Sequence, residues 1–174
     1  MNTVTTARAG ATAAPFRYRR LAAPLGGEIC DLDLTRPLDD DVFATVRAAF
    51  LDSEGVLILR DQRITPAQHI AFSRRFGPLM IHVLRQFLLP GHPEILLVSN
   101  VIENGKPVGL GDAGQYWHSD LSYKELPSLG SMLHAQELPA EGGDTLFADM
   151  HKAWDDLPAA LRTAVEGRSA AHSY

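Results

Sequence analysis

A chain of 174 residues, 45% hydrophobic and 21% charged, has the size and composition of one ordinary globular domain. Its formal net charge of -5 argues against a general nucleic-acid binder, because that function needs clustered Lys and Arg to neutralise phosphates. The single cysteine, Cys30, excludes an intramolecular disulfide framework and favours a reducing, cytoplasmic location. The longest apolar runs are far shorter than the ~20 residues of a membrane span, so we expect no membrane partner.

The N-terminal part of the chain predicts a tail and two short strands. Residues 1–14 are rich in Thr and Ala without an amphipathic repeat, and we expect them to form a disordered tail. Residues 16–21 and 28–34 predict strands on either side of a turn at Gly26 and Gly27.

A helix and a buried strand are predicted next. Asp39 suits an N-cap, and Val42, Val46 and Phe50 follow at the spacing that places them on one helix face. Residues 55–60 form a continuous run of mainly branched apolar residues, which is typical of a buried strand.

The most clearly marked helix starts after Thr65. Thr65, Pro66 and Gln68 combine an N-cap, a proline at the first helical position and a capping-box glutamine. Gly77 suits the left-handed residue that ends such a helix. Residues 94–101 then predict another strand.

The C-terminal third predicts two strands followed by two helices. Residues 129–138 and 145–148 have strand composition and flank a Pro- and Gly-containing turn. Asp149 and Asp156 each suit the N-cap of a following helix. The order of elements, with early helices and later strands, predicts an α+β protein built on a β-sandwich or barrel.

His118 and Asp120 have the spacing of two ligands of one metal ion. In an extended strand, side chains at i and i+2 point to the same face, so these two residues can offer an imidazole nitrogen and a carboxylate oxygen together. A two-histidine-one-carboxylate triad on iron needs one more histidine. The candidates for it are His69, His82, His134, His151 and His172. We favour a solvated or capping role for His69 and His151, and a non-ligand role for His172. His92 and Glu94 have the same spacing as His118 and Asp120, but Gly91 and Pro93 place them in a turn, so we do not expect them to be ligands.

The sequence resembles the N-terminal part of the taurine dioxygenase and TfdA family of iron(II)- and 2-oxoglutarate-dependent dioxygenases. The segments that carry the resemblance are residues 27–29 with 33–34, 55–62, 76–77, 117–120, and 137–139 running into 142–145. The resemblance implies a double-stranded β-helix, or jelly roll, with flanking helices, formed by a partial dioxygenase domain over residues 15–174. It also implies that the enzyme hydroxylates a small organic substrate with dioxygen, while 2-oxoglutarate becomes succinate and carbon dioxide.

The same resemblance assigns roles to individual residues. His118 and Asp120 would be the first two iron ligands, and Thr145 would help to bind a 2-oxoglutarate carboxylate. His82 aligns with a histidine that contacts the sulfonate in taurine-using members. Arg85 stands where those members have a tyrosine, so it either pairs with an anionic substrate, sulfonate or carboxylate, or is a surface arginine.

The family's distal histidine ligand and the arginine that binds the far carboxylate of 2-oxoglutarate belong to the second half of the fold, which these 174 residues do not include. We therefore expect this chain alone to bind iron weakly and to be inactive. Two other classes remain open: a metal-free jelly-roll interaction module, and a cupin-like metal-dependent isomerase or hydrolase. The substrate and the oligomeric state, a homo-oligomer included, are also open.

Overall fold

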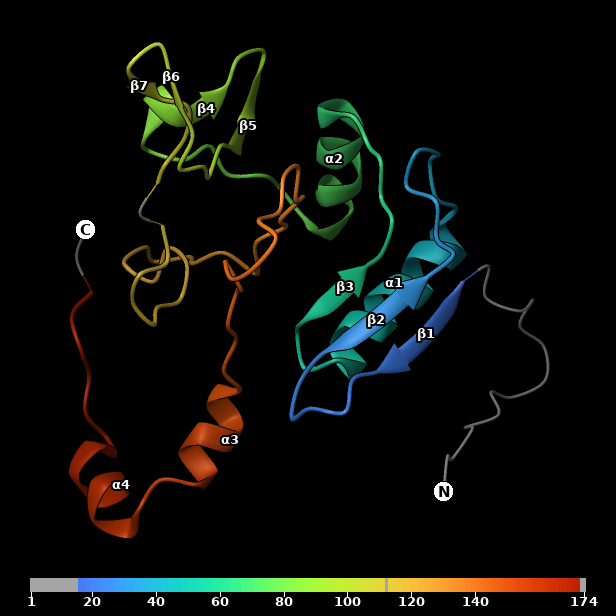
Figure 1. The fold of residues 1–174 in the computed structure, drawn as a ribbon. Coiled ribbons are helices and arrows are strands. Elements are labelled where there is room, and N and C mark those ends of the chain that lie inside the picture. Colours follow the sequence, from blue (N-terminus) through green and yellow to red (C-terminus); the bar gives the residue numbers. More distant parts are fainter. Residues whose placement is uncertain (1–15, 112, 173–174) are drawn as a thin grey trace, which may run out of the picture. The chain divides into compact units, whose positions relative to one another are not determined.

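The computed structural model describes residues 16–111 and 113–172 (Figure 1). These residues fall into two units: the first comprises residues 16–63 and 145–156, and the second comprises residues 64–111, 113–144 and 157–172. The tail predicted for residues 1–14 lies outside the described residues.

A three-stranded sheet forms the centre of the first unit. Strand β1 (Arg17–Arg20) pairs antiparallel with β2 (Gly27–Cys30), and β2 pairs in parallel with β3 (Leu57–Leu59). Helix α1 (Asp40–Asp52) makes the crossover that a parallel pair requires. The predicted strands are confirmed in place but are shorter than expected, because only the paired residues of each predicted segment are strand.

Helix α1 contacts β2 and contributes buried side chains to the core of this unit. Its buried residues are Phe43, Val46 and Ala49. The predicted face was therefore partly wrong, since Val42 and Phe50 are only partly buried and the stripe is rotated toward Phe43. Asp39 is the N-cap residue, as predicted, although its side chain makes no capping hydrogen bond.

The most buried charge of the first unit is the carboxylate of Glu28, in the central strand. Glu28 is 3% exposed, and it forms ion pairs with Arg19 and Arg60. Hydrogen bonding from Arg60, and then the charge and hydrogen bonding of Arg19, lower the pKa of this carboxyl despite its burial. The two arginines come from opposite sides of β2, so the buried charge is compensated from both neighbouring segments.

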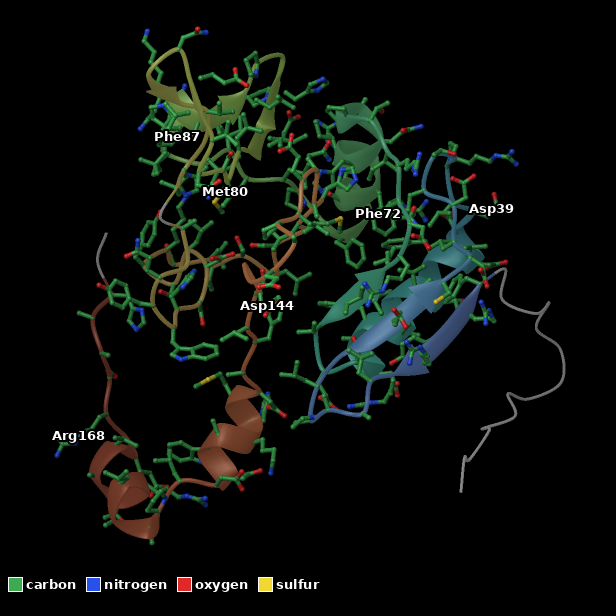
Figure 2. All side chains as sticks on the ribbon, in the orientation of Figure 1. Asp39, Phe72, Met80, Phe87, Asp144 and Arg168 are labelled. Atoms are coloured by element: carbon green, nitrogen blue, oxygen red, sulfur yellow. The ribbon has the colours of Figure 1, made fainter. Side chains whose placement is uncertain are left out.

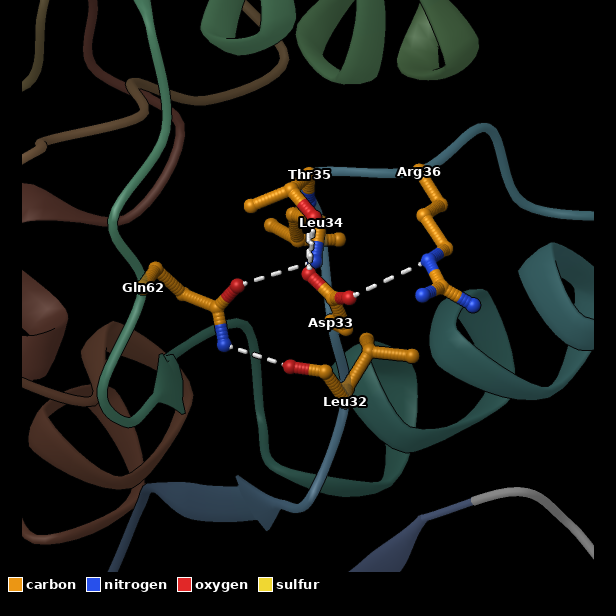
Figure 3. A network of polar contacts seen from close by, with 6 residues as sticks. All are labelled: Leu32, Asp33, Leu34, Thr35, Arg36 and Gln62. Atoms are coloured by element: carbon orange, nitrogen blue, oxygen red, sulfur yellow. Dashed lines mark hydrogen bonds and ion pairs between the residues drawn. The ribbon is translucent and has the colours of Figure 1, made fainter.

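Gln62 joins the chain after β3 to the chain after β2 (Figure 3). Its Nε2 donates to the carbonyl of Leu32 at 2.6 Å, and its Oε1 accepts from the backbone N–H of Leu34 at 3.1 Å. Between them, Asp33 accepts from the N–H and hydroxyl of Thr35. The amide of Gln62 thus replaces a neighbouring strand at the point where β2 has ended.

The second unit opens with the helix that was predicted from its capping signals. Helix α2 (Pro66–Ser73) has the full capping box, with Thr65 accepting from the Gln68 N–H and Gln68 accepting from the Thr65 N–H. A 3₁₀ turn, η1 (Arg74–Phe76), prolongs it to Gly77, which ends the segment as predicted. Its φ of 150° and ψ of -174° differ from the predicted left-handed helical conformation. Phe72 on α2 is buried (Figure 2).

Two small hairpins follow α2 (Figure 1). A 3₁₀ turn, η2 (Arg85–Phe87), leads into β4 (Leu88–Leu89), which pairs antiparallel with β5 (His92–Leu96). Strands β6 (Ile102–Glu103) and β7 (Lys106–Pro107) form the second hairpin. The strand predicted over residues 94–101 is thus shorter and begins two residues earlier.

Two short helices occur toward the C-terminal end. Helix α3 (Met150–Asp155) is capped by Asp149, which accepts from the backbone N–H groups of His151 and Lys152, as predicted. Helix α4 (Ala159–Val165) has Pro158 as its N-cap residue. The capping role predicted for Asp156 was wrong, because the helix starts three residues later and a proline occupies the cap.

Residues 129–138 and 145–148 are not strands in the structure, so that prediction was wrong for the chain as described. Strand formation needs a partner for the backbone N–H and C=O groups, and none of the described residues provides one here. No residue from 113 to 172 is buried. Exposed apolar side chains are frequent in this region, among them Leu129, Leu133, Leu138, Leu146 and Phe147.

The α+β class is confirmed by the helices and small sheets of the described residues, while the jelly roll stays a prediction. None of the helices in the described part of the chain is long and apolar enough to cross a membrane.

Gly27→Ala should destabilise the first unit. A Cβ at Gly27 would lie 2.6 Å from Tyr18 Cε2 and 2.9 Å from Ser53 Cβ, and Ser53 is fully buried. We expect the free energy of unfolding to fall by about 1–3 kcal/mol, as for other overpacked sites, measured by urea denaturation. Gly130→Ala is the control, because no atom lies within 4 Å of its Cβ position, and an equal loss in both variants would contradict the steric explanation.

Tyr18→Phe should remove an alkaline instability. Burial, and then the hydrogen bond to Asp52 at 2.6 Å, raise the pKa of Tyr18 to about 12. The folded protein therefore holds this proton more tightly than the unfolded chain, and the resulting stability is lost as pH rises from about 10 toward 12. Denaturation across this range should show a smaller decline for Tyr18→Phe than for wild type, whereas Tyr116→Phe, at an 82% exposed position, should decline like wild type.

Candidate metal centre

His118 and Asp120 point toward each other in an irregular segment of the second unit, after β7. His118 Nε2 lies 3.2 Å from Asp120 Oδ1, and the two side chains are 53% and 49% exposed. The predicted convergence is confirmed, although the segment is a loop that turns at Asp120 rather than a strand. The i, i+2 spacing brings the two side chains together without strand pairing.

A backbone carbonyl fixes the ring of His118. Its Nδ1 lies 2.7 Å from the carbonyl oxygen of Tyr116. Because a carbonyl can only accept, Nδ1 carries the hydrogen, and in the neutral ring the lone pair is then on Nε2. This is the outer hydrogen bond that metal-binding histidines usually make. The Tyr116 carbonyl, followed by the charge of Asp120, raises the pKa of His118.

A hydroxyl group fixes the carboxylate of Asp120 in a similar way. Ser131 Oγ donates a hydrogen bond to Oδ2, so Oδ1 is the oxygen that faces His118. The next residue, Leu121, has a φ of 57°, a left-handed conformation that costs a branched side chain roughly 1 kcal/mol or more. This conformation turns the chain directly after the candidate ligand.

The pair fits two neighbouring ligands of one metal ion. Atoms bonded at about 2.0–2.2 Å to one ion and at right angles to each other lie about 3 Å apart, close to the 3.2 Å observed between Nε2 and Oδ1. One imidazole and one carboxylate are donors that suit iron and similar transition metals. Within residues 16–111 and 113–172, no group of three or more His, Cys, Asp or Glu residues could hold a metal.

The other histidines of the second unit have different contacts. The rings of His69 and His134 meet edge to face with centroids 5.7 Å apart, and burial followed by the charge of His134 lowers the pKa of His69. His172 Nδ1 lies 2.8 Å from Ser122 Oγ. Within the described residues, none of these contacts brings a third ligand to the pair.

The predicted cosubstrate and substrate residues are not joined to the pair by a hydrogen bond in the described part of the chain. Thr145 is exposed and belongs to the first unit. His82 and Arg85 belong to the second unit, where His82 Nδ1 accepts from the Leu84 N–H at 3.2 Å and Arg85 is exposed in η2. Their functional roles stay predictions.

Sequence reasoning missed Ser131 and the carbonyl of Tyr116. The carbonyl is a backbone group, so no residue type marks it. Ser131 is eleven positions from Asp120, a separation at which no helix or strand period relates the two residues. Only the folded chain shows that these groups orient the candidate ligands.

The sequence matches the model of the family described as "Taurine catabolism dioxygenase TauD, TfdA family" over residues 17–174. The chain belongs to this family. Membership confirms the resemblance carried by the motifs, and the relatives that the chain matches include alpha-ketoglutarate-dependent dioxygenases.

TauD/TfdA relatives match this chain along most of its length. The chain is 38% identical over 139 residues to pentalenolactone F synthase of Streptomyces arenae, a match that covers 78% of the chain and 46% of the relative. It is 36% identical over 153 residues to the alpha-ketoglutarate-dependent 2,4-dichlorophenoxyacetate dioxygenase of Cupriavidus pinatubonensis, covering 82% and 53%. The crystal structure of AAD-2 in complex with Mn(II) and N-oxalylglycine matches with a TM-score of 0.66 at 31% identity, covering 87% and 53%. The chain therefore spans about half the length of these relatives.

Proposed function

We propose that His118 and Asp120 are two iron ligands of an Fe(II)- and 2-oxoglutarate-dependent dioxygenase that hydroxylates a small anionic organic substrate. The observation that carries this proposal is the 3.2 Å approach of Nε2 to Oδ1, with the outer atom of each side chain held by another group. When bound, iron supplies the redox chemistry that couples decarboxylation of 2-oxoglutarate to oxidation of the substrate. The protein's part is to hold the metal and to orient the two organic molecules.

The cosubstrate would be held in part by Thr145. A threonine hydroxyl can donate one hydrogen bond to a carboxylate oxygen, and such a charge-assisted bond is stronger than a neutral one. Thr145 is exposed, so its hydroxyl is accessible to a ligand. The family resemblance supports this role.

The substrate would be recognised by His82 and Arg85. Arg85 is exposed, and a planar guanidinium can bind a carboxylate or a sulfonate with two hydrogen bonds. The relative from Cupriavidus acts on 2,4-dichlorophenoxyacetate, which is a carboxylate. We therefore propose that the substrate is a small organic anion with a carboxylate or sulfonate group.

A complete site would need more polypeptide than these 174 residues contain. Large apolar side chains of residues 129–138 and 145–148 are exposed, although such side chains are mostly buried in a complete domain. The matched relatives are about twice as long. We infer that these segments become strands of a jelly roll when they pair with the second half of the family fold, which also supplies the third iron ligand and the 2-oxoglutarate-binding arginine.

Two alternatives make different predictions for the same measurement. A metal-free jelly-roll module would bind neither iron nor 2-oxoglutarate at the pair. A cupin-like isomerase or hydrolase would bind metal without regard to 2-oxoglutarate. Only the dioxygenase requires both at one site.

Anaerobic addition of Fe(II) and 2-oxoglutarate should produce a visible metal-to-ligand charge-transfer band that neither component produces alone. Because each ligand contributes directly to the metal bond, His118→Ala and Asp120→Ala should weaken iron binding by about tenfold or more. His151→Ala is the control, because the hydrogen bond that His151 donates to Asp149 comes from its backbone N–H and is kept in the variant. Iron binding without any response to 2-oxoglutarate would instead support the isomerase or hydrolase.

The 174-residue chain alone should release no succinate above the level given by iron and 2-oxoglutarate in buffer. Adding the C-terminal half of the Cupriavidus relative as a second polypeptide should strengthen iron binding, because a third ligand then becomes available. Succinate release is measured by chromatography and iron binding by titration. Turnover by the isolated chain at the rate of a full-length relative would refute the idea that the site is incomplete.

A further inference from the structure

We propose that Ser131 is a positioning residue that selects the metal-binding orientation of the Asp120 carboxylate, and that helix α2 holds Ser131 in place. This inference rests on the proposed function, because it assumes that Asp120 binds a metal. It adds a residue that neither the sequence motif nor the family match singles out.

The hydrogen bond from Ser131 distinguishes the two oxygens of Asp120. Ser131 Oγ donates to Oδ2, while Oδ1 lies 3.2 Å from His118 Nε2. Rotation of a carboxylate about its last torsion is soft and nearly twofold, and 49% of the Asp120 side chain is exposed. Without the hydroxyl, either oxygen or neither could face His118. The hydroxyl therefore reduces the orientational freedom that metal binding would otherwise have to remove.

Ser131 belongs to a segment without secondary structure, so its position must be fixed by side-chain contacts. The residues that follow it contact α2. The His69 ring hydrogen-bonds the backbone of Met132 and meets the ring of His134 edge to face, with centroids 5.7 Å apart. In the segment 131–134, Met132 and His134 thus contact α2, and Ser131 contacts the candidate ligand Asp120.

A second residue of α2 strengthens this attachment. Ser73 Oγ lies 2.7 Å from the His69 carbonyl and 3.2 Å from the sulfur of Met132. The hydroxyl has a single hydrogen, which the closer carbonyl accepts, so the sulfur makes a polar contact with the oxygen. Met132 is therefore held at its backbone by His69 and at its side chain by Ser73.

Helix α2 is a suitable support because its own geometry is strongly determined. It has a capping box at Thr65 and Gln68, a proline at its first turn, and two buried residues, Ile70 and Phe72. A helix fixed at its start by a capping box and held by two buried side chains loses little further freedom when it contacts another segment. Helix α2 therefore holds Met132 and His134, their neighbour Ser131 is held with them, and Ser131 orients Asp120. All these residues lie in the second unit.

The test is the affinity for Mn(II), measured from the electron paramagnetic resonance signal of the free ion. Ser131→Ala should weaken Mn(II) binding by about tenfold, the usual effect of losing a hydrogen bond to a metal ligand. Ser131→Thr keeps the hydroxyl and should restore most of the affinity. Ser119→Ala, next to both candidate ligands, is the matched control and should bind like wild type.

The outcomes separate this inference from the proposed function. If wild type binds no Mn(II), or if Asp120→Ala binds as tightly as wild type, the metal site itself is wrong. If wild type binds and Asp120→Ala does not, but Ser131→Ala retains full affinity, only the role of Ser131 is wrong. Equal weakening in Ser131→Ala and Ser131→Thr, with unchanged circular dichroism, would also overturn it, because the hydroxyl would then make no difference.

Discussion

Polar atoms that are buried away from water need a hydrogen-bond partner, and this constraint explains the main polar contacts within each unit. In the first unit, Glu28 occupies the central strand and is 3% exposed. An isolated carboxylate there would be costly, but Arg19 and Arg60 reach it from the segments on either side. Because the buried charge needs both arginines, separating β1 or the end of β3 from β2 would leave Glu28 without one of these partners. Gln62 extends the same principle past the end of the strand, where its amide satisfies two backbone groups.

The candidate metal centre obeys this constraint with less burial. About half of each side chain of His118 and Asp120 is exposed, so water could satisfy their outer atoms. The chain instead uses the Tyr116 carbonyl and the Ser131 hydroxyl. Each of these bonds is made by the atom that faces away from the pair, so His118 Nε2 and Asp120 Oδ1 face each other. The fixed orientation of both side chains is what we expect of two metal ligands that are positioned before the metal binds. Two polar residues that are neighbours by chance would not need it.

The sequence predicted what is decided locally. The capping box of α2 needs only Thr65 and Gln68, and the approach of His118 to Asp120 needs only a two-residue separation, so both were found. Residues 129–138 failed as a strand because composition reports a preference for strand, whereas pairing depends on partners elsewhere in the fold. The buried stripe of α1 was misplaced by a fraction of a turn, since Val42 and Phe43 are both apolar and only the packed core selects between them. Ser131 was missed because its bond to Asp120 joins residues eleven apart in a loop.

The two candidate ligands are oriented by residues of this chain, whereas many apolar side chains of the same chain are left exposed. Within the described part of the chain, the contacts that position His118 and Asp120 come from residues 69–134 of the second unit. Under the proposed function, these two ligands can therefore be oriented without the second half of the family fold. The apolar side chains of residues 129–138 and 145–148 remain exposed in the same chain. Under the proposed function, weak iron binding by this chain then follows from the number of ligands rather than from their misplacement. Adding the third ligand should therefore restore affinity without rearranging the first two.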